Sequence, residues 1–317
     1  MKILKKKILS YQCSLSFIFY LLIGLSSISA QDLDKYPIKN LKNPLIDEPG
    51  MSDPHMFVVN DTCYVFTGHD VGFGISDWVM PDWRIFMSTD LQNWKLIGTI
   101  SPKNNIMGEG NTNCWAGDIA TRNGKYYWYY SNRKEGAGVM IADRPEGPYK
   151  DALGSYLVDS FDPTIFVDDD NIPYIIYGEG TYKIARLKES MIELDEEPKE
   201  ITIKRTSYFP ETDKNSLHKY NGIYYLSCSG YYAISNNVYG PYETKGVVGV
   251  GFGLDTGYGH GDFFIWKGDW YHTWCRYRKR TKDRIRDCFI APTYYQDAKM
   301  YNDTRHINEK FISSGID

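Results

Sequence analysis

Residues 51–69, MSDPHMFVVNDTCYVFTGH, join an apolar strand to an aromatic strand through the turn pair Asn60-Asp61. A two-residue turn followed by a short aromatic strand occurs four more times, in KYYWYYS (125–131), IPYIIYG (172–178), IYYLSCS (223–229) and DWYHTWC (269–275). One tyrosine marks each copy, at intervals of 62, 48, 50 and 47 residues; the five are Tyr64, Tyr126, Tyr174, Tyr224 and Tyr271. A period of about 40–50 residues made of short strands is typical of propeller blades. The sequence therefore predicts an all-β fold, a five-bladed β-propeller.

Length and composition favour one large domain that does not bind nucleic acid. The chain has 317 residues, and five blades need most of that length, so residues 31–317 are predicted to form the propeller. Aromatic residues make up 15% of the chain, including 27 Tyr and 8 Trp, whose rings suit both blade cores and the flat faces of sugars. The formal net charge is −4 and there is no long basic run, which argues against a nucleic-acid partner.

The first 30 residues have the pattern of a secretory signal. A lysine-rich start is followed by an apolar stretch over residues 14–25 and by the small pair Ser29-Ala30. The apolar stretch is short for a membrane span. The pattern predicts a signal peptide over residues 1–30, a secreted or periplasmic protein, and no membrane insertion once the signal is removed.

Polar residues open the strand before each marker strand, at nearly the same distance from each marker tyrosine. Asp53, Trp115 and His260 each lie 11 residues before their tyrosine, and Asp162 lies 12 before its own. Because the innermost strand of every blade lines the central channel, we expect these positions to converge there. Two blades leave alternatives open, which are Trp115 or Asp118 in the second blade and Glu211 or Asp213 in the fourth.

Two of these positions are Asp-Pro pairs in matched settings, SDPHMFVVND (52–61) and FDPTIFVDDD (161–170). An isolated Asp-Pro pair usually only caps a turn, but its repetition at equivalent blade positions favours a functional role for Asp53 and Asp162. Carboxylates crowded at a channel mouth raise one another's pKa. A carboxyl group with a raised pKa can deliver a proton while an ionised neighbour activates water, which is the division of work in glycoside hydrolysis.

These segments, together with CWAGDIATRNGKYYWYYS (114–131) and the GHG at 259–261, make the chain resemble glycoside hydrolase family 43 over residues 48–295. The resemblance implies a five-bladed glycosidase of the arabinofuranosidase or xylosidase type, acting with inversion on side chains of plant-type polysaccharides or oligosaccharides. It also implies that Asp53 is the general base and that Asp162 orients the general acid and tunes its pKa. The acid itself is implied to be a Glu that opens the fourth blade.

The acid position departs from the family pattern. Where family members have Glu-Gly-Pro or Glu-Ala-Ser, this chain has PETDKNSLHKYNG (210–222). An alignment without gaps on residues 217–219 puts Asp213 in the acid's place, and two extra residues put Glu211 there. We favour Glu211, because the family uses Glu and the longer side chain reaches further; Asp213 then becomes a substrate contact or a turn cap.

The resemblance implies further ligand contacts. His260, in GYGHGDFF, is expected to face a calcium ion that is held mainly by water, since calcium prefers oxygen ligands; a structural histidine is the alternative. The remaining candidate substrate contacts are His55, His69, Asp70, Trp115, Asp118, Asp213 and Arg276. Trp115 is alternatively core packing. Arg276 belongs to a basic stretch expected after the fifth blade, where a solvated edge strand is the alternative.

Two competing functions use the same fold. One is a glycosidase for a different sugar, such as a galactoside or an anhydro-sugar oligomer, because loops at the channel rim select the sugar. The other is a non-catalytic carbohydrate-binding propeller, since propellers also serve as scaffolds. Retention of Asp53, Asp162 and an acid candidate favours the enzyme. The sequence makes no prediction of the oligomeric state.

Overall fold

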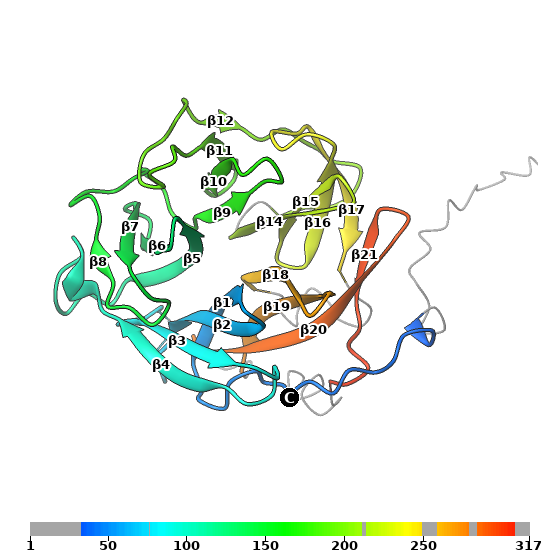
Figure 1. Ribbon diagram of the computed structural model, residues 1–317, viewed down its shortest axis with the longest axis horizontal. Helices are drawn as coiled ribbons and strands as arrows, with labels where there is room; N and C mark the ends of the chain where they lie inside the picture. The colour runs from blue at the N-terminus through cyan, green and yellow to red at the C-terminus, as the bar shows by residue number, and fades with distance from the viewer. Residues whose placement is uncertain (1–32, 76, 211–213, 249–258, 279–283, 308–317) are drawn as a thin grey trace, which may run out of the picture.

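The structure is a computed structural model that describes residues 33–75, 77–210, 214–248, 259–278 and 284–307. Five sheets, antiparallel apart from one short pairing in blade four, stand around a central axis like the blades of a propeller (Figure 1). The predicted all-β, five-bladed β-propeller is therefore confirmed. The predicted signal peptide over residues 1–30 lies outside the described residues, as do Glu211 and Asp213.

Each blade is built from consecutive strands of the chain. Blade one contains β1 (Met51–Val59), β2 (Thr62–His69), β3 (Trp83–Ser88) and β4 (Lys95–Ile100), and blade two contains β5 (Cys114–Arg122), β6 (Lys125–Asn132), β7 (Ala137–Ala142) and β8 (Lys150–Asp151). Blade three contains β9 (Thr164–Val167), β10 (Pro173–Tyr177), β11 (Lys183–Arg186) and β12 (Lys199–Glu200). Blade four contains β14 (Asn215–Tyr220), β15 (Ile223–Cys228), β16 (Tyr231–Ser235) and β17 (Tyr242–Val247), and the short β13 (Ile203–Lys204) runs parallel to β17. Blade five contains β18 (Gly261–Trp266), β19 (Asp269–Tyr277), β20 (Arg286–Gln296) and β21 (Lys299–Asn302).

One strand from each blade belongs to an inner ring. These strands are β1, β5, β9, β14 and β18. In this ring β1 lies beside β5 and β18, and β9 lies between β5 and β14. The hairpins that follow these strands explain the repeated turn pairs. Asn60-Asp61, Asn123-Gly124, Asn221-Gly222 and Lys267-Gly268 all have positive φ, as the two-residue turns that match strand twist require. In these four blades the turn pair therefore fixes where the inner strand ends.

Aromatic side chains fill the space between neighbouring blades. Between blades one and two, for example, the Phe66 ring stacks on Trp128 with centroids 5.3 Å apart, and Trp83 meets Trp128 edge-on at 5.9 Å. All three side chains are fully buried. Each buried ring contributes roughly 2–3 kcal/mol through removal of apolar area from water. These contacts explain the high aromatic content and hold the blades, and so the inner strands, at fixed angles.

The chain preceding β1 closes the ring against blade five. The amide of Leu45 donates to the carbonyl of Cys288, and the Asn43 side chain bonds both the amide and the carbonyl of Ile290 at 2.8 and 3.0 Å. Leu45 also packs in the apolar cluster shared by blades one and five. Blade five is longer than expected: Arg276 lies inside β19, its second strand, rather than after the blade.

Candidate active site

Asp53 and Asp162 share an unusual backbone conformation. Their φ angles are 48° and 57°, in the left-handed region that Asp tolerates better than most residues. In blade one the ladder shifts register between Ser52 and His55, which is a β-bulge. Bulges next to active sites re-aim side chains. The repeated Asp-Pro pairs thus occupy equivalent structural positions, with both carboxylates buried.

His260 connects the two aspartates. Its Nδ1 lies 2.8 Å from Oδ1 of Asp53, and its Nε2 lies 3.9 Å from Oδ2 of Asp162. The backbone amide of Asp162 donates to the Ser131 hydroxyl at 2.8 Å, which holds the blade-three aspartate against blade two. Residues from blades one, three and five therefore meet at one point, as their spacing from the marker tyrosines predicts.

Arg286 is the principal residue of the site that the sequence analysis missed. Its guanidinium spans both carboxylate oxygens of Asp53 and reaches Oδ2 of Asp70 through Nε at 3.0 Å. The Ser52 hydroxyl donates to the other oxygen of Asp70 at 3.1 Å. Arg286 comes from β20, so the pair closes across the junction of blades one and five. Asp70 thus belongs to the site through Arg286, which it holds in place.

The charges around Asp53 determine its ionisation. Burial alone would raise the pKa of Asp53, but the Arg286 guanidinium and then His260 lower it well below its usual value. Burial raises the pKa of Asp70 despite the same arginine. Asp53 is therefore ionised at neutral pH, which is the state that a general base needs.

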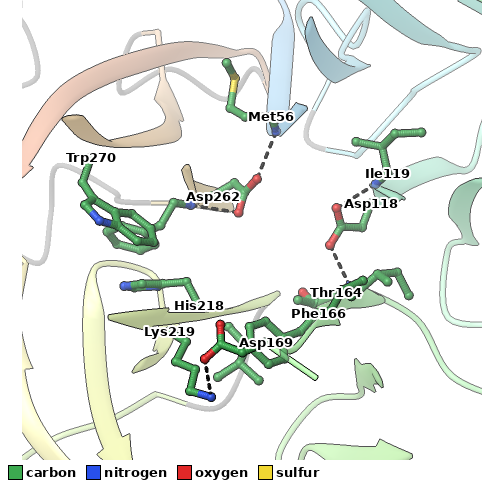
Figure 2. A pocket seen from close by; sticks show the side chains of 14 residues that line it. Met56, Asp118, Ile119, Thr164, Phe166, Asp169, His218, Lys219, Asp262 and Trp270 are labelled. Carbon is green, nitrogen blue, oxygen red and sulfur yellow. Dashed lines mark hydrogen bonds and ion pairs between the residues drawn. The ribbon is translucent and has the colours of Figure 1, made fainter. Parts of the chain in front are cut away.

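A second set of polar residues lies around Asp118 and Asp262. Asp118 accepts from the amide of Ile165 at 2.8 Å, and the Nδ1 atom of His55 lies 3.4 Å from its carboxylate. Asp262 accepts from the amides of Met56 and Phe263 at 3.0 and 2.8 Å. Asp118 and Asp262 face one another across a cavity of about 280 Å³ (Figure 2). Asp118 and Asp262 both line this cavity, and the buried His55 lies beside Asp118.

The remaining predicted contacts lie around this core. The Trp115 ring packs against Phe161, next to Asp162, at 6.1 Å, and the Arg133 guanidinium lies over it at 5.3 Å. His69 pairs with Asp82 at 2.9 Å. Arg276 is buried, which removes the solvated edge strand as an account of it, and its guanidinium lies over the Phe289 ring at 4.6 Å. Arg286, rather than Arg276, is the arginine that contacts Asp53.

The surroundings of His260 do not form a cage for the calcium ion predicted there. Its two ring nitrogens point to Asp53 and Asp162, and calcium prefers six to eight oxygen ligands. Among the residues that the structure describes, no group of three or more His, Cys, Asp or Glu side chains could hold a metal ion. The calcium ion stays a prediction, and these residues do not fit one well.

Asp262 makes the stability of the protein depend on pH. Burial and then the charge of Asp118 raise the pKa of Asp262 to about 7, so its contribution to stability is present below about pH 4 and is lost as the pH rises through 7. We expect Asp262→Asn to reduce the fall in the free energy of unfolding between pH 4 and 8 by on the order of 3 kcal/mol. Urea titrations at several pH values measure it. An unchanged pH dependence, matching that of the exposed control Asp297→Asn, would contradict the assignment.

The chain is similar to known proteins over most of its length. The model of glycosyl hydrolases family 43 matches residues 41–300. A xylosidase/arabinosidase of Bacteroides ovatus is 28% identical over 74% of this chain and 88% of its own length. An arabinoxylan arabinofuranohydrolase of Paenibacillus polymyxa is 29% identical over 82% of this chain but only 51% of its own length.

The solved structures show the same fold. A family 43 β-xylosidase/α-arabinofuranosidase from a compost metagenome, in complex with xylotriose and in a calcium-free form, superposes with a TM-score of 0.73. That likeness covers 84% of this chain and 97% of the other, at 22% sequence identity. In the described part of the chain, no helix has the length and apolarity needed to cross a membrane. The chain belongs to glycosyl hydrolases family 43 and is a glycosidase built on a five-bladed β-propeller.

Proposed function

We propose that the protein is an inverting glycosidase that removes α-L-arabinofuranosyl or β-D-xylosyl units from plant-type polysaccharides or oligosaccharides. The observation that carries the proposal is the ionised Asp53, which Arg286 and His260 hold, with Asp162 on the other side of His260. The names of the relatives, which include both xylosidase and arabinofuranohydrolase, support these two sugars.

In the proposed reaction, Asp53 takes a proton from a water molecule as that water attacks the anomeric carbon. An acid from the segment 211–213 donates a proton to the leaving oxygen, and Glu211 is our choice over Asp213. The base and the acid of an inverting site stand about 6.5–9.5 Å apart, which leaves room for the water. Arg286 keeps Asp53 ionised and aimed, and Trp115 offers a ring on which the sugar can pack.

A substrate screen tests the proposal. Purified protein is assayed with aryl α-L-arabinofuranoside, β-D-xyloside and β-D-galactoside, and then with arabinan and arabinoxylan oligosaccharides. We expect turnover of the arabinofuranoside or the xyloside. Turnover of the galactoside alone would move the protein to the alternative glycosidase function. Binding of the oligosaccharides by calorimetry without any turnover would identify a carbohydrate-binding propeller instead.

Asp162 is proposed to hold the acid protonated through its negative charge. We expect Asp162→Asn to lower the rate and to move the basic limb of the kcat/KM profile to lower pH, because the acid then loses its proton more readily. The control is Asp159→Asn, an exposed aspartate on the same loop. A lowered rate with an unmoved basic limb would leave Asp162 with a purely structural role.

Export is the proposed localisation, on the basis of residues 1–30. Expression of the full chain in a bacterial host, followed by N-terminal sequencing of exported protein, tests it. The expected new N-terminus is Gln31, and retention of the whole chain in the cytoplasm would contradict the proposal.

A further inference from the structure

Two cysteines lie opposite one another in the sheet of blade five. Cys275 in β19 is paired with Cys288 in β20. The amide of Cys275 donates to the carbonyl of His260 at 2.9 Å, and its carbonyl accepts from the amide of Gly259 at 2.7 Å. The carbonyl of Cys288 accepts from the amide of Leu45 at 2.7 Å, on the side away from β19. The cysteines thus form a non-hydrogen-bonded pair, in which the Cα atoms of an antiparallel ladder lie about 4.5 Å apart.

The two sulfur atoms lie on the same face of this sheet, because residues directly opposite in an antiparallel pair share a face. Both point toward blade one. The thiol of Cys275 donates to Oδ1 of Asp53 at 3.6 Å, and the thiol of Cys288 donates to the carbonyl of Met51 at 3.0 Å. A disulfide needs Cα atoms roughly 4.4–6.8 Å apart and side chains that point the same way. The pair therefore has the backbone arrangement of a cross-strand disulfide.

The structure contains three more cysteines among its described residues, and none of them has this arrangement. Cys63, Cys114 and Cys228 each lie opposite residues other than cysteine in their ladders. All five cysteines are thiols in the structure, and all five are buried. Ladder pairing thus selects Cys275 and Cys288 from the set.

Burial determines when a bond between these two cysteines can form. It raises the pKa of Cys275 to about 12 and the pKa of Cys288 well above its usual value. Because the thiolate is the reactive species, both thiols react poorly in the folded protein. The bond must therefore form while the chain folds, before β1 and β20 bury the two sulfur atoms. Export, the proposed localisation, takes the chain into a compartment that favours disulfides.

We propose that Cys275 and Cys288 form a cross-strand disulfide when the protein folds under oxidising conditions, and that this bond fixes β20 to β19 beside Asp53. One thiolate attacks a disulfide oxidant such as oxidised glutathione, and the second thiolate then displaces the mixed disulfide. One S–S bond forms in the protein and one breaks in the oxidant, whose two released thiols take up the two protons. Arg286 lies two residues before Cys288, so the bond fixes the strand that brings the guanidinium to Asp53.

Alkylation and mass spectrometry test the proposal. The full chain is refolded in a buffer of reduced and oxidised glutathione, unfolded in iodoacetamide without reductant, and digested with trypsin. We expect the peptides of Cys275 and Cys288 to be joined by a disulfide, and those of Cys63, Cys114 and Cys228 to be alkylated. Reduction before alkylation should release the joined peptides. Alkylation of both Cys275 and Cys288 in the unreduced protein, or a bond from either one to another cysteine, would overturn the proposal.

The bond should also raise the melting temperature. It closes the short loop of residues 275–288, and closure of such a loop restricts the unfolded chain. We expect protein refolded with oxidised glutathione to melt about 5 °C higher than protein refolded and kept in reductant. Cys275→Ala and Cys288→Ala should each abolish this difference. Equal melting temperatures of oxidised and reduced wild type would contradict the stabilising role.

Cys63→Ala is the matched control. Cys63 packs in the same apolar cluster as Cys275 and Cys288 but lies opposite no cysteine. This variant should melt lower under both conditions, because it leaves a small cavity, and should keep the difference between them. If the alanine variants of the pair do not fold, the peptide map of the wild type decides alone. None of these measurements requires turnover, so their failure is distinct from failure of the glycosidase proposal.

Discussion

Asp53→Asn is expected to lower kcat/KM by about 10³-fold on the sugar that the wild type cleaves. The amide cannot accept the proton of the attacking water, and in an inverting reaction no covalent intermediate replaces that step. The fold should survive, because Asn tolerates the left-handed backbone of position 53 and its oxygen still accepts from Arg286. Steady-state kinetics and a thermal melt measure the two effects separately.

Asp61→Asn is the control, because it makes the same replacement of aspartate by asparagine at another position with positive φ. Asp61 also has positive φ, at 59°, and lies in the exposed turn that ends β1. That variant should keep wild-type kinetics. If Asp53→Asn retains more than about a tenth of wild-type activity, well above the loss expected for a missing general base, Asp53 is not the base.

The second large effect concerns the general acid. Glu211→Gln is expected to abolish cleavage of substrates with poor leaving groups, such as oligosaccharides, by about 10²–10⁴-fold. Activated aryl glycosides should be affected far less, because a good leaving group needs little protonation. The measurement is the ratio of kcat/KM for a nitrophenyl glycoside to that for the matching oligosaccharide, in each variant.

Asp213→Asn is the competing variant, since an alignment without gaps selects Asp213 as the acid. If Asp213→Asn shows the leaving-group dependence and Glu211→Gln does not, Glu211 is the wrong choice. A loss that is equal on both kinds of substrate in both variants would exclude this segment as the source of the acid.

The blades were predictable because each one repeats a local signal. A turn pair followed by an aromatic strand can be recognised in the sequence without knowing which strands pack against it. Four of the five turn pairs have positive φ at both residues, as such turns require. The sequence also predicted a functional role for the Asp-Pro pairs, because Asp53 and Asp162 occupy matched positions in their blades. His260 followed from the same spacing and does lie between them.

Arg286 was not predictable, because it does not belong to the repeat. Arg286 reaches Asp53 across 233 residues of chain, through the closure of blade five on blade one. The sequence pattern favoured Arg276 instead, although the buried guanidinium of that residue lies over the Phe289 ring.

The stereochemistry of hydrolysis tests the central claim most directly. Proton NMR of the reaction mixture, recorded in the first minutes before the product sugar mutarotates, identifies the anomer that is released first. We predict the anomer opposite to that of the substrate, because a single attack by water activated by Asp53 inverts the anomeric carbon. Release of the same anomer as in the substrate would require a covalent glycosyl–enzyme intermediate, and it would contradict the assignment of Asp53 as a general base.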